Sequence, residues 1–303
     1  MAIIANTFTT YDASGNREDL TSVVTNISPI DTYFTSNTGT APVKARYHEW
    51  TTDALAAAAA NAQMEGGEIA AAAITPKGRT GNYTQVIAKA FAISDTQAKV
   101  DQTGPTSPIA YHTAKTLKEL ARDIEYALVI NAAAVTGITG TARVLCGVLG
   151  WISTNVTTAA TGTTSATLTN TVVNANLQTL WSAGGDPKIA LVGGFVKRTI
   201  SAFTDNTKFT MADEKTLTAA VDIYQSDFGP IAIKLHRQLN TTQPSTMIIL
   251  GDMDLWKKCW LEPVRTEEWA RTSLARKFVI SCELTLEARQ EKGASKITQI
   301  TNA

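Results

Sequence analysis

The sequence predicts an α+β fold, and three observations lead to this class. A long amphipathic helix is expected at residues 107–134, and a long alternating strand is expected at residues 277–289. Stretches with helical and strand periodicity do not follow each other in the regular alternation that builds a parallel βαβ sheet. With 303 residues, 44% of them hydrophobic, the chain has enough apolar side chains for a sizeable core.

Charge and composition exclude several classes of function. Lys and Arg total 27, as do Asp and Glu, so no net charge draws the protein onto nucleic acid or an anionic membrane. The first residues, MAIIANTFTTYD, lack a basic segment followed by an apolar one, and no run is long enough to span a membrane. Folding in a cytoplasm is therefore expected. The three cysteines are widely spaced, which predicts buried, reduced thiols.

The N-terminal third is predicted to form an arm, residues 1–40, followed by an extended hairpin loop, residues 41–95. Residues 43–51 and 83–94 alternate between polar and apolar side chains, as paired strands do. The Ala- and Gly-rich stretch between them has few large apolar residues and cannot build a core. Because an isolated hairpin is marginal in water, this one needs a surface of its own chain or of a neighbouring copy.

The helix at residues 107–134 is expected to be the backbone of the fold. Ser107 is a good N-cap, and Pro108 suits the first helical position, where no amide donor is needed. Apolar side chains recur at steps of three and four, so we expect one stripe to pack on a sheet that includes the strand at residues 277–289. The stripe is predicted to consist of Ala110, Ala114, Leu117, Ala121, Ile124 and Leu128.

The remaining chain is expected to contain shorter elements. Thr169 or Asn170 should cap a helix that runs through Trp181 and ends at Gly184. A buried strand, KIALV, should lead through the Gly193–Gly194 turn into a helix at residues 195–203. Further strands are expected at residues 218–226, 230–235, 247–250 and 296–300, the last as a short partner of the strand at 277–289, and residues 255–261 are expected to form a short helix or a strand.

The common catalytic signatures are absent from the sequence. His48, His112 and His236 have no second ligand nearby in sequence, so we expect them at the surface rather than on a metal. The sequence therefore predicts no catalytic residue, no metal site and no cofactor. One alternative stays open, because the Gly193–Gly194 turn precedes a helix N-terminus that can cradle a phosphate, as in an α+β enzyme.

Four stretches resemble the major capsid proteins of tailed bacteriophages, in the family typified by the phage SU-ten. In chain order they are NTFTTYDASGNREDLTSVVTNISPIDTYF, RTGNYTQVIAKAFAISDTQAKVDQTG, ELARDIEYAL and KFVISCELTLEAR. The resemblance covers nearly the whole chain and implies the tailed-phage major capsid fold, with a peripheral domain at 96–167 and 247–303 and an axial domain at 168–246. It also implies a structural protein that self-assembles into hexamers and pentamers of an icosahedral virion shell around double-stranded DNA.

The same resemblance implies the partners of the chain. The expected arm begins almost at Met1, without the cleavable scaffolding domain of many relatives, so a separate scaffolding protein is expected. A portal and a decoration protein are further expected partners, together with packaged DNA bound non-specifically, and no membrane is expected. Assembly is expected in the cytoplasm of a bacterial host. The shell of a bacterial encapsulin compartment, which shares this fold, is a second alternative.

An uncovered arm and hairpin imply obligate oligomerisation, because they expose backbone and apolar side chains. Candidate subunit contacts lie in the hairpin loop and in a charged cluster near residues 265–276: Arg46, Trp50, Glu65, Glu68, Arg265, Glu267, Arg271 and Arg276. A solvated face is the alternative interpretation of the charged cluster. Some proteins of this fold link loops covalently through Lys, but residues 52–76 contain no Lys, so a noncovalent shell is expected.

Overall fold

The computed structural model describes residues 32–69, 71, 73–74, 76–100, 107–160, 165–203, 223–240, 245–271 and 273–301. Most of the expected arm, at residues 1–31, and the start of the strand expected at 218–226 lie outside these ranges. The helices are α1 (Tyr33–Asn37), α2 (Asp95–Lys99), α3 (Pro108–Ile130), α4 (Val148–Trp151), α5 (Asn170–Ser182) and α6 (Gly194–Ser201), with 3-10 turns η1 (Arg237–Asn240), η2 (Met253–Leu255) and η3 (Glu291–Gly293). None of the helices in the described ranges is both long and apolar enough to cross a membrane.

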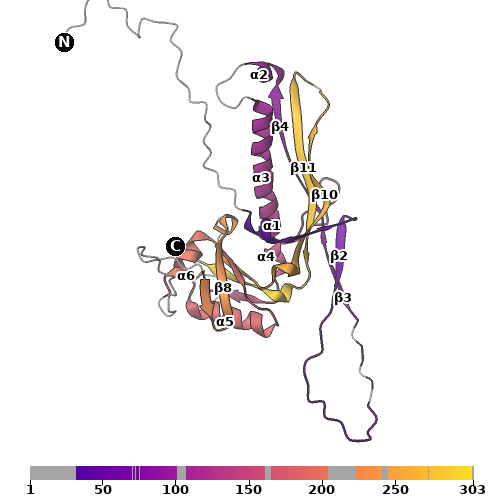
Figure 1. Ribbon diagram of the computed structural model, residues 1–303, viewed down its shortest axis with the longest axis vertical. Helices are drawn as coiled ribbons and strands as arrows, with labels where there is room; N and C mark the ends of the chain where they lie inside the picture. Colours follow the sequence, from indigo (N-terminus) through magenta and orange to yellow (C-terminus); the bar gives the residue numbers. More distant parts are fainter. Residues whose placement is uncertain are drawn as a thin grey trace, which may run out of the picture.

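Three sheets organise the described chain (Figure 1). The strands are β1 (Gly39–Pro42), β2 (Tyr47–Thr52), β3 (Gly78–Tyr83), β4 (Gln85–Ser94), β5 (Val156–Thr158), β6 (Ile189–Val192), β7 (Ile223–Ser226), β8 (Gly229–Leu235), β9 (Ser245–Leu250), β10 (Trp256–Glu268), β11 (Ala275–Ala288) and β12 (Ala294–Ile300). A four-stranded sheet has the order β1-β10-β11-β4, and a six-stranded sheet has the order β5-β12-β9-β6-β8-β7. The strands β2 and β3 pair only with each other and carry a long loop away from the body.

Helix α3 lies along β4 and β11, as expected for the element that supports this half of the molecule (Figure 1). The Oγ of Ser107 accepts a hydrogen bond from the backbone N–H of Ala110 at 3.4 Å, and Pro108 is the first helical residue, so the predicted start is confirmed. The helix ends at Ile130, before the predicted Ala134, because Asn131 leaves the helical region with ψ near 119°.

The predicted apolar stripe of α3 was wrong in its first half. Ile124 and Leu128 are buried, but Leu117 is 38% exposed and Ala114 is exposed. The buried face instead runs through Thr116 and Leu120, each one position before a residue that the pattern selected. Thr116 lies on this face although it is polar, so counting only apolar residues shifted the predicted stripe onto the exposed alanines.

The described residues form two hydrophobic cores, and β6 and β9 contribute to both. The first core lies between α3, the four-stranded sheet and one face of the six-stranded sheet, and the second lies between the other face and helices α5 and α6. Ile248 and Leu250 of β9 enter the first core, whereas Met247 and Ile249 enter the second. This alternation follows from the two-residue period of a strand that is covered on both faces.

The predicted hairpin has a different pairing from the one expected. Residues 43–51 were expected to pair with 83–94, but β2 pairs with β3, with Tyr47 opposite Tyr83 and Thr52 opposite Gly78. Strand β4 instead pairs with β11 along its full length. A segment with strand periodicity can pair with any edge that matches its apolar face, so periodicity alone did not identify the partner.

The C-terminal half contains most of the expected elements. The side chain of Thr169 caps α5, which ends at Ser182, and Gly184 then adopts a φ of +92°, a conformation that favours glycine. The expected strand-turn-helix at Gly193 forms as β6 and α6. The ambiguous segment at 255–261 belongs to the long strand β10. One expectation was wrong, because β12 pairs with β9 and β5 and not with the long strand β11.

Candidate assembly surfaces

The loop between β2 and β3, residues 53–77, reaches far from both cores (Figure 1). Among its described residues no helix or strand occurs. It nevertheless carries large apolar side chains, with Leu55 99% exposed, Met64 84% exposed and Ile74 94% exposed. Side chains of this kind in an unsupported loop mark a surface that a partner covers.

The base of the hairpin is held firmly on the body by Asn82, which is fully buried. Its Nδ2 donates to the backbone oxygens of Cys146 and Leu286, each at 2.9 Å, and its Oδ1 accepts from the backbone N–H of Cys146 at 2.9 Å. The side chain of Asn82 therefore satisfies three hydrogen-bonding groups of two distant segments. The loop thus projects from a fixed base.

Trp50, one of the candidate contact residues, packs mainly within its own chain. Its ring lies 5.3 Å from that of Trp151 and 5.7 Å from that of His48, measured between centroids. Its indole Nε1 is buried with no hydrogen-bond partner among the described residues. The two paired strands β2 and β3 are called the ribbon below. Trp50 is therefore placed to fix this ribbon to the body of the subunit rather than to present a free aromatic surface.

The arginines of the charged cluster have partners inside the chain. Arg276 forms two hydrogen bonds to Glu268, at 2.7 and 2.6 Å, and its guanidinium lies 5.3 Å from the ring centroid of Phe278. Arg271 lies 2.6 Å from Asp95. These pairs lie at the surface, where water and salt screen them, so they add little to the stability of the fold.

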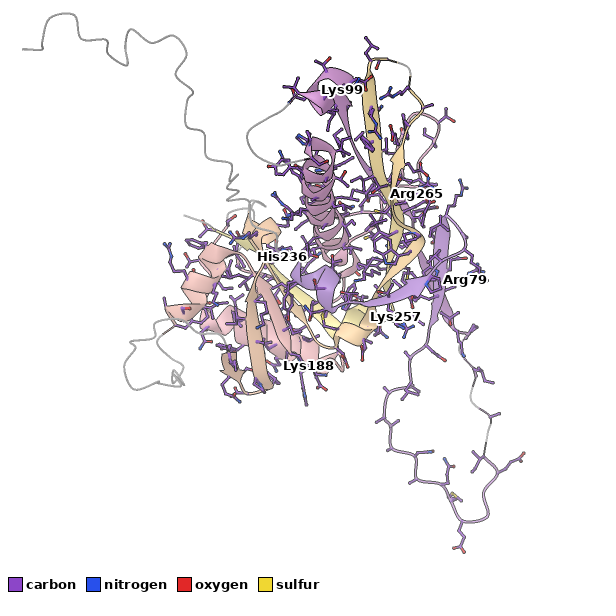
Figure 2. The ribbon with its side chains drawn as sticks, turned by 45° about the horizontal axis from the view of Figure 1, so that its top comes forward. Arg79, Lys99, Lys188, His236, Lys257 and Arg265 are labelled. Carbon is purple, nitrogen blue, oxygen red and sulfur yellow. The ribbon has the colours of Figure 1, made fainter. Side chains whose placement is uncertain are left out.

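Arg265, the third arginine of the cluster, lies on β10 along the elongated unit that contains α3 and β11 (Figure 2). It pairs with Glu262 at 2.5 Å and with Glu267 at 3.3 Å. Both partners are also exposed to solvent. The charged face can therefore exchange these partners for groups on another molecule at little cost in free energy.

Three other candidates are exposed on or beside the ribbon. Glu65 and Glu68 lie in the loop on either side of the Gly66–Gly67 turn, and Arg46 precedes β2. No ion pair joins any of these three side chains to another group within the part of the chain that the structure describes. Arg46, Glu65 and Glu68 are thus available to a neighbouring molecule.

A buried polar cluster that the sequence analysis did not predict surrounds Glu125, a fully buried residue of α3. One carboxylate oxygen accepts from the backbone N–H of Phe34 at 2.8 Å and faces His236 Nε2 at 2.9 Å. The other accepts from the backbone N–H of Thr35 at 2.8 Å and from its hydroxyl. The carboxylate thereby caps the first turn of α1, a role that a residue adjacent in sequence usually has.

The surroundings of Glu125 keep it charged. Burial alone raises the pKa of this carboxyl, but the hydrogen bonds from His236, Thr35 and Phe34 together outweigh burial, and the pKa lies below its usual value. Lys258 lies nearby and donates to the backbone oxygen of Thr35 at 2.5 Å. Glu125 therefore joins the end of the arm, the long helix and the segment after β8 in one network.

Two of the three histidines do not lie free on the surface. His236 was expected there, but its side chain is 0% exposed, where α3 meets the six-stranded sheet (Figure 2). His48 is half-buried, and its Nε2 lies 3.2 Å from Glu287. In the sequence, Glu125 and Glu287 stand among apolar residues, and a buried carboxylate needs a polar partner. This was the only sign that histidines would be drawn into the interior.

All three cysteines are buried and free, as the sequence predicted. Burial raises the pKa of Cys282 to about 11. Burial and the neighbouring carboxylate of Glu287 raise the pKa of Cys259 to about 12. These thiols are neutral at physiological pH and do not act as exposed nucleophiles.

Comparisons with known proteins agree with the fold. Residues 3–301 match the family model described as SU10 major capsid protein. A major capsid protein of Escherichia phage Phieco32 is 32% identical over 127 residues, which cover 42% of this chain and 36% of that protein, so the match spans about a third of the relative.

Solved structures with low sequence identity share the fold. The capsid subunit of cyanophage A-1(L) superposes with a TM-score of 0.69 at 14% identity, over 97% of this chain and 98% of that chain. An encapsulin complex from Synechococcus elongatus superposes with a TM-score of 0.61 at 7% identity, over 94% of each chain. The chain has the fold of tailed-phage capsid proteins, and it belongs to the SU10 major capsid protein family, a family of structural virion proteins and not of enzymes.

Proposed function

We propose that the chain is the shell-forming subunit of a tailed double-stranded DNA phage and assembles into hexamers and pentamers of an icosahedral capsid. The observation that carries this proposal is the long loop between β2 and β3. It projects from a base fixed by Asn82 and exposes Leu55, Met64 and Ile74. A neighbouring copy is the partner that family membership favours for this surface.

The candidate contacts fit this arrangement. Glu65 and Glu68 at the loop can pair with cationic side chains of the neighbour, and the exposed cluster around Arg265 and Arg271 offers such groups. Each pair contributes about 0–1 kcal/mol, so many copies must act together. We also propose that the half containing α3 and the four-stranded sheet is the peripheral domain, and that residues 168–246, with β9 and β12 completing the sheet, form the axial domain.

Further partners follow from the same proposal. A shell of this kind needs a scaffolding protein, a portal for DNA entry and, in some shells, a decoration protein. The net charge of zero suits a wall that contains DNA without adhering strongly to it. Assembly would take place in the cytoplasm of the bacterial host.

The purified protein is expected to form capsomers and closed shells, because a single copy leaves the loop uncovered. Light scattering and negative-stain electron microscopy check this. A compact monomer that persists at high protein concentration would contradict the proposal. A variant with Leu55, Met64 and Ile74 all replaced by Ser should assemble poorly while its far-UV circular dichroism stays unchanged, because these side chains contact neither core.

The structural likeness to an encapsulin keeps a second function in view, namely a compartment shell that encloses protein. The two functions differ in content and not in the shape of the shell. Nuclease-protected double-stranded DNA inside particles purified from an infected host would support the phage capsid. Particles that contain an enzyme and no genome would support the compartment instead.

The shell is expected to hold together without covalent links between subunits. Residues 52–76 contain no Lys, and the flanking Lys44 and Lys77 lie near the base of the loop. A strand shift of several residues would be needed to bring either one to the tip. Assembled particles boiled in detergent should therefore give a single band near 32.4 kDa on a denaturing gel. A ladder of multimers would show that this prediction is wrong.

A further inference from the structure

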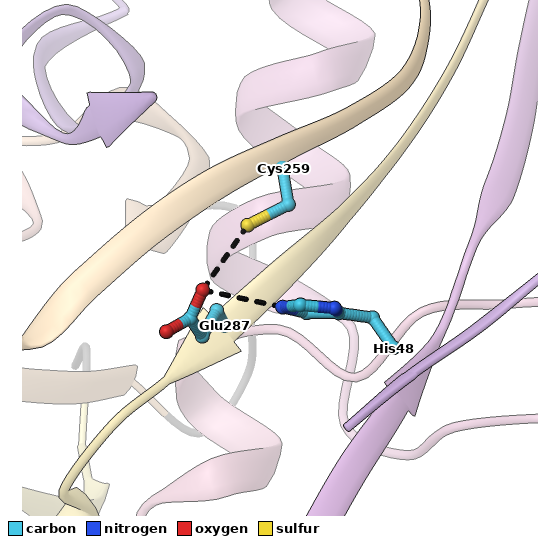
Figure 3. Close-up of side chains that lie close together, drawn as sticks. All are labelled: His48, Cys259 and Glu287. Atoms are coloured by element: carbon cyan, nitrogen blue, oxygen red, sulfur yellow. Dashed lines mark hydrogen bonds and ion pairs between the residues drawn. The ribbon is translucent and has the colours of Figure 1, made fainter. Parts of the chain in front are cut away.

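We propose that His48, Cys259 and Glu287 form a binding site for a thiophilic divalent cation such as Zn²⁺, where the ribbon of β2 and β3 meets the four-stranded sheet (Figure 3). Imidazole nitrogen, thiolate sulfur and carboxylate oxygen are the donors that Zn²⁺ prefers in proteins. The three donor atoms all lie within 4.8 Å of one another. They come from three strands: β10 and β11, which follow each other in the chain, and β2, which lies far from both in the sequence.

The separations between the donor atoms suit a tetrahedral cation. Donor atoms at the usual bond lengths to zinc, about 2.0–2.3 Å, lie roughly 3.3–3.8 Å from one another around a tetrahedron. The distance from Glu287 Oε2 to His48 Nε2 is 3.2 Å, and that to Cys259 Sγ is 3.4 Å. Two of the three distances between donor atoms therefore already have nearly the required length. Binding needs only a small side-chain adjustment to bring His48 Nε2 and Cys259 Sγ, which lie within 4.8 Å of each other, to the required separation.

The backbone holds each donor in place. Glu287 is opposite Lys257 in the register of β10 and β11, and Cys259 is opposite Thr285, so Cys259 and Glu287 are diagonal neighbours on one face. His48 is opposite Asn82 in the ribbon, and the three hydrogen bonds of Asn82 fix that position on the body. The arrangement is preorganised on strands, not on loops.

The surroundings of the three donors resemble the outer shell of a metal site. Arg289 Nε donates to Glu287 Oε1 at 2.8 Å, which orients the carboxylate and leaves Oε2 directed at the other two donors. The side chain of His48 is 23% exposed, whereas Cys259 is fully buried, so the histidine side provides the route for a cation and a position for a fourth ligand from water.

The charges and protons balance on binding. Arg289 and Lys257 oppose a divalent cation, but the carboxylate and the thiolate that forms on binding supply two negative charges. The Cys259 proton leaves to solvent, since a coordinating thiol is deprotonated by the metal. His48 binds through Nε2 and keeps its ring proton on Nδ1. Binding should therefore weaken as the pH falls.

Cobalt spectroscopy tests the proposal. Untagged, assembled protein is treated with a chelator, dialysed and titrated with Co²⁺, whose thiolate complexes absorb in the near ultraviolet by charge transfer. We expect this band to saturate at one ion per chain and to disappear when Zn²⁺ is added. C259S should lack the band, whereas C282S, which changes another buried cysteine, should retain it.

A second variant separates metal binding from folding. H48Q changes a half-buried residue and should weaken Co²⁺ binding at least about tenfold, whereas H112Q, which changes a histidine on α3, should leave it unaltered. Absence of the band in the wild-type protein, its persistence in C259S or an unchanged affinity in H48Q would each overturn the proposal. Weak binding that is equal in all variants would show an adventitious ion only, and would also overturn it.

Discussion

Replacing Leu120 with Asp is expected to yield insoluble protein that forms no shells. Leu120 is 1% exposed in the core between α3 and the four-stranded sheet. The substitution removes about 1.5–3 kcal/mol of burial and places a carboxylate without a partner in an apolar site. A total loss above about 4–5 kcal/mol is comparable with the whole stability of many domains.

Leu117 provides the matched control, because it lies on the same helix and is 38% exposed. Leu117→Asp is expected to remain soluble and to assemble. The fraction of each variant in the soluble lysate, followed by electron microscopy of that fraction, measures the difference. Equal solubility of the two variants would mean that the buried face of α3 is not the one the structure shows.

Replacing Glu125 with Ala is expected to cost about 3–5 kcal/mol of stability, because it leaves buried donors of Phe34, Thr35 and His236 without an acceptor. The control is Glu119→Ala on the same helix, which removes an exposed pair with Lys89 and should cost at most about 1 kcal/mol. Scanning calorimetry of capsomers at neutral pH compares the two. A Tm for Glu125→Ala that equals that of the control would contradict the assigned network.

The pH dependence of the Glu125 contribution has a definite sign. Because the pKa of Glu125 is lowered in the folded chain, its contribution is fully present above the unfolded-state value of about 4.3. The contribution is lost as the pH falls through the lower folded-state value. The difference in Tm between the wild-type protein and Glu125→Ala should therefore shrink on acidification below about pH 4.3, and a difference that stays constant would argue against a charged Glu125.

Local signals in the sequence identified the helices and strands better than they identified which strands pair with each other. Ser107, Pro108 and Thr169 act on their own helices, so their roles could be predicted from a few neighbouring residues. The pairing of β4 with β11 and of β12 with β9 depends on segments far apart in the chain. Strand periodicity shows that a segment is a strand, but it does not specify which other strand it pairs with.

Buried polar residues explain the remaining errors. Thr116 interrupts the apolar pattern of α3 although it faces the core, and this shifted the predicted stripe to Leu117. The clusters around Glu125 and Glu287 join residues more than a hundred positions apart, so no spacing rule could reveal them. A carboxylate in an otherwise apolar stretch is the one local sign that such a partner exists.

The sharing of β6 and β9 between the two cores limits how the subunit can deform. A hinge between the cores would have to separate strands whose side chains are buried on both faces, which would expose apolar surface on each side at once. The folded subunit, which can be pictured as a tile of the shell, should therefore move as one rigid body. If a shell of such tiles changes its diameter or flattens its faces, the movement has to occur at the joints between tiles and in the long loop, the parts that neither core holds.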